Sequence, residues 1–285
     1  MTFDPIAWAA RHGATPGPPL ERAPVPAASG TVLVDAESLL VAVEPAVAAV
    51  AVEARLREEG LTLGVFPERY EAASVGDLID ADEPGAGASG PGFGSLVTGH
   101  DDGLVVLGVR HRPAAQSGRG LLLESFGAGC EAMRLMAQTG VLPEIALLAD
   151  GESADLLLQL SGDPDRATRS LGDGQALLVL IAAGGQGEAA ARAERAIAIC
   201  APSLTADLGQ NVARAWAASR YDLPSHTEVL GAAGYRLDTV RTWYRWSRLK
   251  GAFADATEGV WRGRELVGAT PHGAVLQDRV LHALV

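Results

Sequence analysis

The sequence predicts an α+β fold in two parts, and three observations indicate it. Two short aliphatic runs near the start, residues 31–35 and 39–44, favour strands joined by a tight turn. An alanine-rich segment with several glutamates and arginines, residues 47–59, favours a helix. From Gly120 onward, strand-like and helix-like segments alternate. A chain of 285 residues can form one large domain or two modest ones.

The composition excludes several classes of protein. The net charge is −12, and an acidic chain lacks the basic surface that binds nucleic acid. No apolar run is long enough and uncharged enough to cross a bilayer, and the first residues do not resemble a secretory leader. We therefore expect a soluble, cytoplasmic protein with no nucleic-acid or membrane partner. Cys130 and Cys200 lie in helix-like runs, where a buried free thiol is the expected state.

The first part begins with a short amphipathic helix at residues 6–12, followed by a proline-rich connector. Gly60 is expected to cap the C-terminus of the next helix, because glycine adopts positive φ without strain. Beyond it, Glu68, Tyr70 and Glu71 favour a solvated turn over a ligand-facing wall.

A glycine-rich loop at residues 85–94 follows a short helix-like segment at residues 77–80. Its glycines let the backbone approach a ligand closely. Successive N–H groups in such a loop can converge on a carbonyl or a phosphate. An ordinary turn is the alternative explanation of the same pattern.

The second part is predicted from the alternation of apolar and helix-forming segments. Strands are expected here at residues 121–126, 141–150 and 177–184, and helices at residues 129–138 and 188–200, whereas an expected strand at residues 103–113 belongs to the first part. The last third of the chain carries most of the aromatic side chains.

The pieces between residues 60 and 97 resemble, in their order, the second flavin-binding segment of the FAD-linked oxidases. This family belongs to the vanillyl-alcohol oxidase or PCMH-type superfamily and includes alkyl-dihydroxyacetonephosphate synthase-like and glycolate oxidase-like branches. Its segment reads GLTLG-x-x-P, then a TVGG-like turn, then G-x-x-S-x-x-YG. The resemblance implies cofactor contacts at the matching positions, Pro67, Ser74, Val75, Gly76, Ser89 and Gly94. Asp77 departs from the pattern, because the family has a second glycine there.

Three further stretches resemble the cap, or substrate, domain of the same family. They are residues 126–143, the W-x-x-x-R-Y-x-x-P run at 216–224, and residues 234–249. The resemblance implies a curtailed PCMH-type FAD-binding-like domain at residues 1–115. It also implies a cap-like antiparallel sheet with helices, shortened at its C-terminus, at residues 116–285.

The diphosphate loop of the family is the clearest departure. By position it should fall at residues 17–24, where three prolines supply no N–H and Glu21 adds a negative charge. A diphosphate needs amide donors or cations, and Arg22 is the one cation of this segment. We therefore expect a degenerate flavin site and no cofactor, with FAD bound if the family function is retained.

Three residues are candidates for catalysis. The family's pattern makes Arg220 a candidate to hold an anionic substrate group, and a helix-capping arginine is the alternative. His226 and His272 are candidate acid–base groups, since histidine titrates near neutrality. A structural or solvent-exposed histidine is the alternative for each.

Three aromatic residues are candidates to wall an apolar substrate pocket, with core or interface packing as the alternative: Tyr221, Trp243 and Trp246. No spacing of histidine, cysteine and carboxylate residues is typical of a metal site, so no metal is expected. Nucleophile-elbow and P-loop motifs are absent from the sequence as well.

Three functions follow as hypotheses. The leading one is a family member that has lost flavin redox and binds a small apolar molecule between its two parts, transforming it by cyclisation or isomerisation. The second is a working FAD-dependent oxidoreductase. The third is a non-catalytic subunit that docks on a complete flavin oxidase, so the expected protein partner is a flavoprotein or a second copy of the chain.

Overall fold

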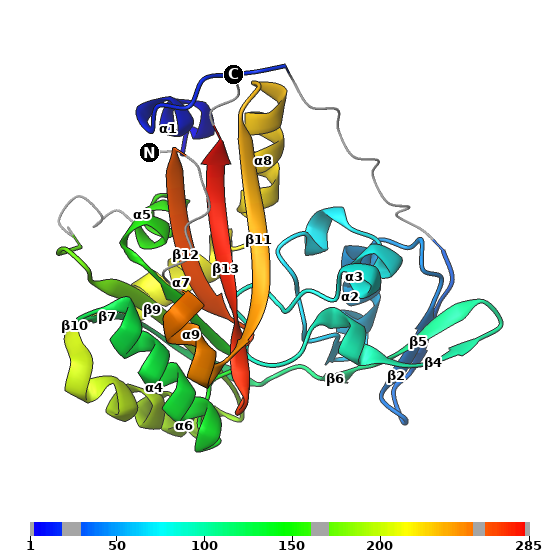
Figure 1. Cartoon of the computed structure of the whole chain (residues 1–285). Helices are drawn as coiled ribbons and strands as arrows, with labels where there is room; N and C mark the ends of the chain where they lie inside the picture. Colours follow the sequence, from blue (N-terminus) through cyan, green and yellow to red (C-terminus); the bar gives the residue numbers. More distant parts are fainter. Residues whose placement is uncertain (1–2, 19–29, 161–170, 253–259, 283–285) are drawn as a thin grey trace.

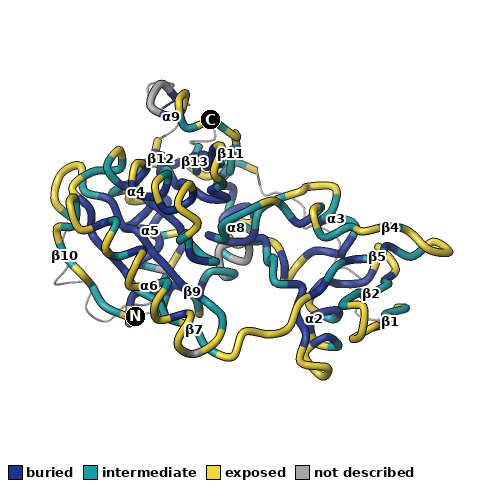
Figure 2. Tube along the Cα trace, turned by 90° about the horizontal axis from the view of Figure 1, so that it is seen from below, coloured by how far each residue is buried: buried dark blue, intermediate teal, exposed yellow. Residues whose placement is uncertain are grey.

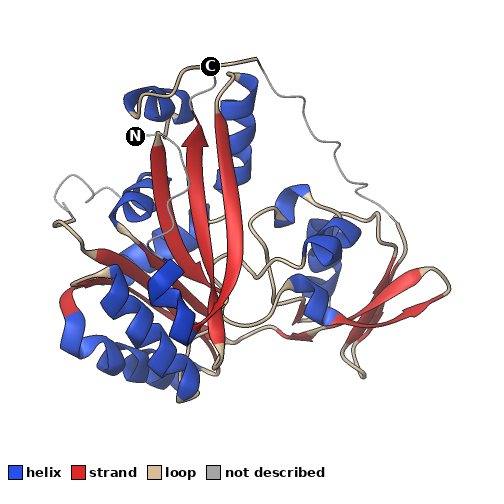
Figure 3. Ribbon diagram, viewed as in Figure 1, coloured by secondary structure: helices blue, strands red, loops and turns tan. Residues whose placement is uncertain are grey.

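A computed structural model of the 285-residue chain describes residues 3–18, 30–160, 171–252 and 260–282 (Figure 1). These residues fold into two bodies, each built around an antiparallel sheet with helices packed on it (Figure 3). The predicted α+β class is therefore confirmed. No described helix is long and apolar enough to span a membrane.

The first body is a four-stranded sheet in the order β1-β2-β5-β4, with a small two-stranded sheet of β3 and β6 beside it. Its elements are β1 (Val32–Asp35), β2 (Leu40–Val43), α2 (Ala49–Glu58), β3 (Leu61–Thr62), α3 (Val75–Ala81), β4 (Val97–Asp101), β5 (Leu104–Gly108) and β6 (Arg110–His111). The predicted strand at 103–113 is split in two, because β5 and β6 join different sheets.

Alternation of buried and partly exposed residues explains how this body packs. Val41 and Val43 on β2 and Leu107 on β5 point to one side, where they form a core with α2 and α3. Helix α2 ends where Gly60 adopts φ +70°, as predicted. Helix α3 begins at Ser74, which forms a capping box that satisfies its first amides.

The second body is a seven-stranded sheet in the order β10-β7-β9-β8-β12-β13-β11, all pairs antiparallel. Its elements are β7 (Ala115–Leu123), α4 (Phe126–Gln138), β8 (Ile145–Ala149), α5 (Gly151–Leu160), β9 (Ala176–Gly184), α6 (Gln186–Cys200), β10 (Leu204–Gly209), α7 (Gln210–Ser219), α8 (Asp222–Ala232), β11 (Arg236–Arg245), α9 (Trp246–Ala252), β12 (Trp261–Val267) and β13 (Gly273–His282).

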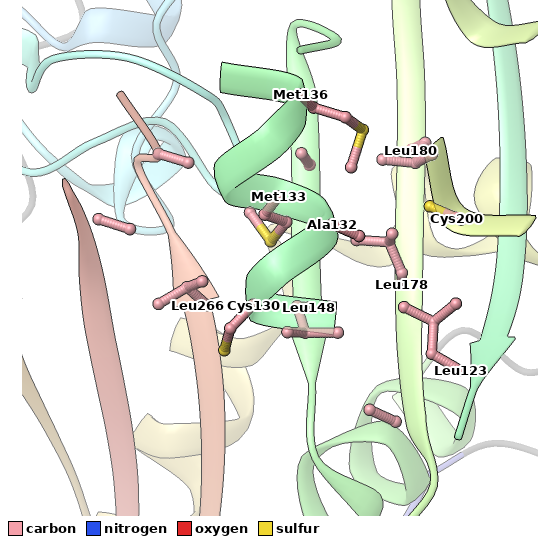
Figure 4. Packing of buried hydrophobic residues seen from close by; sticks show 14 of the residues in the cluster. Leu123, Cys130, Ala132, Met133, Met136, Leu148, Leu178, Leu180, Cys200 and Leu266 are labelled. Atoms are coloured by element: carbon pink, nitrogen blue, oxygen red, sulfur yellow. The ribbon is translucent and has the colours of Figure 1, made fainter. Parts of the chain in front are cut away.

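Helices cover both faces of this sheet around β9. On one face, Met133 and Met136 of α4 pack with Leu178 and Leu180 of β9, and α6 lies beside them (Figure 4). On the other face, α5 and α7 pack against the same strands. Cys130 and Cys200 are both free thiols buried in this core of the second body. Burial raises the pKa of each thiol to about 12.

Helix α1 (Pro5–Arg11) lies on the second body, away from β1 (Figure 1). The Trp8 ring meets Trp261 edge-on at 5.0 Å, and both are buried with Leu230 of α8. The Gly17 amide donates to the Gly234 carbonyl, which fixes the end of this segment to the turn after α8. The sequence predicts this helix in a first domain of residues 1–115, whereas in the structure α1 packs on the second body.

A candidate ligand cleft between the two bodies

A cleft of about 1000 Å³ lies between the first and second bodies. It is bounded by α2, the loops after β3 and α3, strand β6, and the adjoining ends of β8 and β9. Its lining includes Glu53, Arg57, Phe66, Tyr70, Ala88, Ser89, Arg110, Arg112, Glu144, Ile145, Ile181, Ala183, Arg220 and Tyr221. A cleft of this size accommodates a small organic molecule.

One wall of the cleft is a row of aromatic rings that ends in an arginine. Phe66 and Tyr70 meet at 4.9 Å and 69°, and Tyr70 and Tyr221 lie 5.8 Å apart. The Arg220 guanidinium stacks 4.8 Å from the centre of the Tyr221 ring. Burial raises the pKa of Tyr221 to about 12, despite the nearby Arg220 charge, so its hydroxyl is protonated at neutral pH. Burial also raises the pKa of Tyr70.

The opposite wall is aliphatic and comes from the second body. Ile145, Ile181 and Ala183 line it at the ends of β8 and β9. Glu144 fixes this region to the glycine-rich loop, because its carbonyl accepts from the Ser89 amide at 2.9 Å. A planar or chain-like apolar group therefore fits between a wall of rings and a wall of aliphatic side chains.

Cationic side chains also face the cleft, although the chain carries a net charge of −12. Arg112 pairs with Glu53 at 3.0 Å, and Arg110 donates to the Gly64 carbonyl at 2.9 Å. Arg57 adds a further guanidinium on α2. The lining also contains the carboxylates of Glu53, Glu71 and Glu144, so four arginines and three glutamates leave the cleft close to neutral, unlike the acidic chain as a whole.

Two polar atoms at the cleft are buried without a hydrogen-bond partner. They are the Nε of Arg220 and the Oγ of Ser89, and both residues line the cleft. An unsatisfied buried donor costs about 1–3 kcal/mol, so a native structure retains one chiefly where a ligand or water meets it. Arg220 also borders a small cavity of about 20 Å³ beneath the cleft, together with Glu68 and Ser219.

The amides of the glycine-rich loop are largely used within the protein. Ala86 donates to Phe66, Ser89 to Glu144, and Gly90 to Ala269. Ala88, Phe93, Gly94 and Ser95 also donate internally. Between residues 86 and 95, no two successive amides are left for a ligand, so the predicted phosphate-binding arrangement does not form here.

FAD is the cofactor that the resemblance implies. The diphosphate of FAD needs converging amides or cations, and the glycine-rich loop provides no such group. The segment predicted to carry the family's diphosphate loop, residues 17–24, falls outside the described residues after Pro18. Gly17 itself lies against Gly234 on the second body. Of the described residues, the glycine-rich loop therefore does not supply the converging amides that the diphosphate of FAD needs.

Five of the six residues implied as cofactor contacts do not line the cleft; only Ser89 does. The Ser74 hydroxyl is engaged in the capping box with Asp77, and the Gly76 amide donates to Pro45 at 2.8 Å. Val75 is completely buried in the core of the first body.

The other two, Pro67 and Gly94, also have structural surroundings. The Pro67 carbonyl accepts from Tyr70, and the Gly94 amide donates to the Asp82 carboxylate at 2.9 Å. The flavin-like segment order is thus present, but its polar groups bind neighbouring parts of the chain.

The predicted catalytic and substrate residues separate in the structure. Arg220 and Tyr221 lie together in the cleft. The His226 ring, on α8, packs edge-on against Phe3 at 5.0 Å, so it lies at the interface with the N-terminal segment. His272 is exposed in the turn before β13. Neither histidine lines the cleft, because α8 and this turn lie at other parts of the second body.

The two predicted tryptophans also lie elsewhere. Trp243 is half exposed on the edge strand β11, and the Trp246 indole donates to the Thr270 carbonyl at 3.0 Å while packing on the second-body core. Neither is part of the cleft lining. Trp246 therefore has the core-packing role that was the alternative in the sequence.

The solvated turn predicted for Glu68 and Tyr70 is wrong, because Tyr70 is 6% exposed and Glu68 is enclosed by arginines of the second body. Glu68 pairs with Arg279 and, at 3.2 Å, with Arg241. Burial opposes the charge of Glu68, but Arg279 and Arg241 outweigh it and lower the pKa of this carboxyl.

Arg241 and Arg279 also belong to a buried polar cluster on the second-body sheet. Arg279, which is 1% exposed, also pairs with the fully buried Glu265 at 2.9 Å. Gln277 donates to Glu265 at 2.7 Å and accepts from Arg241 at 2.6 Å. This cluster holds the loop that carries Phe66 and Tyr70 against the second body and so fixes one wall of the cleft.

Several cleft residues were missed in the sequence. Arg110 and Arg112 flank His111 with a spacing of two, which places both on one side of an extended strand and was the available signal. Ile145 and Ile181 gave no signal that separates a cleft wall from an ordinary core. Among the described residues, no group of three potential metal ligands occurs.

Comparisons with known proteins agree with the fold. The sequence matches the family described as FAD linked oxidases, C-terminal domain, over residues 112–267, which is more than half of the chain and most of the second body. No curated protein matches the sequence.

Solved structures with a similar fold are distant in sequence. One structure of alkyldihydroxyacetonephosphate synthase has a TM-score of 0.71 at 16% identity, covering 88% of this chain and 57% of the other. A structure of p-cresol methylhydroxylase with substrate bound has a TM-score of 0.60 at 13% identity, covering 88% of this chain and 64% of the other. The chain thus spans less than two thirds of the length of these structures. From the family match and the shared fold, the chain belongs to the FAD-linked oxidase family.

Proposed function

We propose that the cleft binds a small organic molecule with an apolar body and one anionic group, without flavin redox. The observation that carries this proposal is Arg220, which lines a cleft of rings and aliphatic side chains and whose buried Nε has no hydrogen-bond partner. A carboxylate or similar anion would complete a charge-assisted hydrogen bond there.

The surroundings of Arg220 support this role. Its guanidinium lies over Tyr221 and 5.9 Å from the Trp216 ring, so it is held before a ligand arrives. A preorganised arginine loses less freedom on binding than a mobile one. Ile145 and Ile181 supply the apolar contact area opposite it.

A redox-neutral role is supported by the glycine-rich loop, because most of its amides donate hydrogen bonds to other groups of the protein. Because the glycine-rich loop has no row of free amides, a flavin would lack the amide anchor for its diphosphate there. Any catalysis would come from shape and a few polar groups, as in a cyclisation or isomerisation that the cleft favours by holding one conformation. The protonated Tyr221 hydroxyl would be an available donor.

The test combines a spectrum with a binding measurement. The purified protein should be colourless in the visible range, and a set of aromatic and aliphatic carboxylates, screened by thermal shift and native mass spectrometry, should contain binders. For a binder, Arg220→Met should weaken the dissociation constant by about 10–100-fold, the range of one charge-assisted hydrogen bond.

Arg214→Met is the matched control, because Arg214 is an exposed arginine on α7, the helix that Arg220 caps at its C-terminus. It should leave the dissociation constant unchanged. A yellow protein with stoichiometric FAD would instead favour an FAD-dependent oxidoreductase, and equal affinities for the two variants would remove Arg220 from the site.

A further inference from the structure

The four-stranded sheet of the first body has two unlike faces. Its inner face, with Val41, Val43 and Leu107, is buried under α2 and α3. On its outer face no described helix packs (Figures 1 and 3). Neighbouring residues alternate between the two faces along β2 and β5, as the burial of each strand shows.

The outer face carries an apolar row that crosses the sheet. The strand register places Leu33, Ala42, Val106 and Gly99 in one row across all four strands. Leu33 is 58% exposed, the largest exposure among the large hydrophobic side chains of the described residues. Ala42 and Gly99 have small or no side chains, so an approaching surface could insert apolar groups between Leu33 and Val106.

The charges around this face have one sign. No lysine or arginine occurs between residues 30 and 54 or between residues 70 and 109. The exposed carboxylates of Asp35, Glu44 and Asp101 lie at the ends of the strands that form the face. The apolar row is therefore enclosed by an acidic rim without a neutralising lysine or arginine from these segments.

We infer that this outer face docks a different protein, which presents an apolar ridge within a rim of lysine or arginine. Charge complementarity selects this occupant, because a polyanion such as nucleic acid or an acidic membrane would be repelled. A second copy of the chain would place the same acidic rim against itself.

The experiment uses the full chain, tagged, in an extract of the cells that express it, with a reagent that couples carboxylates directly to amines. Lys250 is the chain's one lysine, so couplings to Asp35 or Asp101 must come chiefly from lysines of a partner. We expect one stoichiometric partner whose lysines are joined to these carboxylates. Its recovery should fall at least tenfold with Leu33→Asp and with raised salt.

Leu135→Asp is the matched control, because Leu135 is a 38% exposed leucine on α4 of the second body. It should leave recovery unchanged, and thermal melts should show that both variants are folded. Three results would overturn the inference: no partner recovered, a partner whose recovery ignores Leu33→Asp, or a wild-type dimer in sedimentation that Leu33→Asp dissociates. The cleft and Arg220 are not involved, so these outcomes are independent of the proposed function.

Discussion

The two sheets of this protein differ in how many of their faces are covered. The first seven residues of β9 in the second body are all buried (Figure 2). The cause is that α4 and α6 pack on one face of the strand and α5 and α7 on the other. Strand β5 in the first body alternates between buried and partly exposed residues, because helices cover one face. The pattern of burial along a strand therefore indicates whether helices cover one face of its sheet or both.

The comparison teaches where each body is sensitive to change. A side chain between two layers has no room to relax, whereas one on the open face has solvent beside it. Substitutions in the doubly covered sheet should therefore be costly, and those on the open face should matter only when a partner is present.

The largest effect is expected at Arg279, which lies where the second-body sheet meets the first body. Arg279→Met would leave Glu265 and Glu68 buried without their main partner, so the free energy of unfolding should fall by about 3–5 kcal/mol. Denaturant titration would measure it. Arg55→Met, which removes an exposed pair with Glu58, should cost no more than about 1 kcal/mol, and similar losses for the two variants would contradict the cluster's role.

A pair of leucines tests the comparison directly. Leu178→Ala, in the middle of β9, should lower the free energy of unfolding by about 2–5 kcal/mol, because it opens a cavity between two layers. Leu33→Ala, on the open face, should change it by no more than about 0.5 kcal/mol. A large loss at Leu33 in the isolated protein would mean that part of the same chain covers this face.

A smaller effect should depend on pH. Burial raises the pKa of Asp150, before α5, to about 6 from 3.8, and the charge of Glu265 adds to the shift, while the Ser153 amide opposes it. The protonated form is favoured in the folded state, so this contribution to stability is complete below about pH 4 and is lost as the pH rises through about 6.

Asp150→Asn cannot ionise and keeps an oxygen for the Ser153 amide. Between about pH 4 and pH 7, the wild type should lose about 2–3 kcal/mol of stability relative to this variant. Equilibrium unfolding of both proteins across that range would show it. Parallel stability curves would mean that the pKa of Asp150 is the same in the folded and the unfolded protein.

The smallest effect is expected at Ser74. Ser74→Ala removes the capping box of α3 and should cost about 1 kcal/mol, and Ser74→Asn should restore most of it. Thermal melts would compare the three proteins. Carboxylate binding in the cleft should be equal in all of them, and a loss of affinity in Ser74→Ala alone would bring this residue back as a ligand contact.

The sequence predicted the elements whose pattern is local. The strands at 31–35 and 39–44, the helix that Gly60 ends and the apolar run at 177–184 all formed as expected. The last three strands were not predicted, because charged and aromatic residues such as Arg241, Trp243 and Arg279 interrupt their alternation. Arg241 and Arg279 are held by distant partners, which no local pattern contains, and Trp243 is half exposed on the edge strand.

The same reason limited the prediction of the site. Arg220 and Tyr221 were found because they share a short motif with the family, and the structure brings them together. Glu68 and Tyr70 were misjudged, because an acidic and aromatic segment normally faces solvent. Arg279, which buries Glu68, lies 211 residues further along the chain. Amides of the glycine-rich loop donate to carbonyls of distant elements, such as those of Glu144 and Ala269. These hydrogen bonds could not be predicted from the sequence of the loop.

The position of α1 has a consequence for how the first body unfolds. The chain leaves the second body after Gly17, forms the first body and re-enters the second body at β7, so the first body is tied down at both ends. When it unfolds alone, it becomes a closed loop with fewer conformations than a free tail of equal length. The burial of Trp8 against Trp261 thus stabilises, through chain entropy, a body that α1 never contacts.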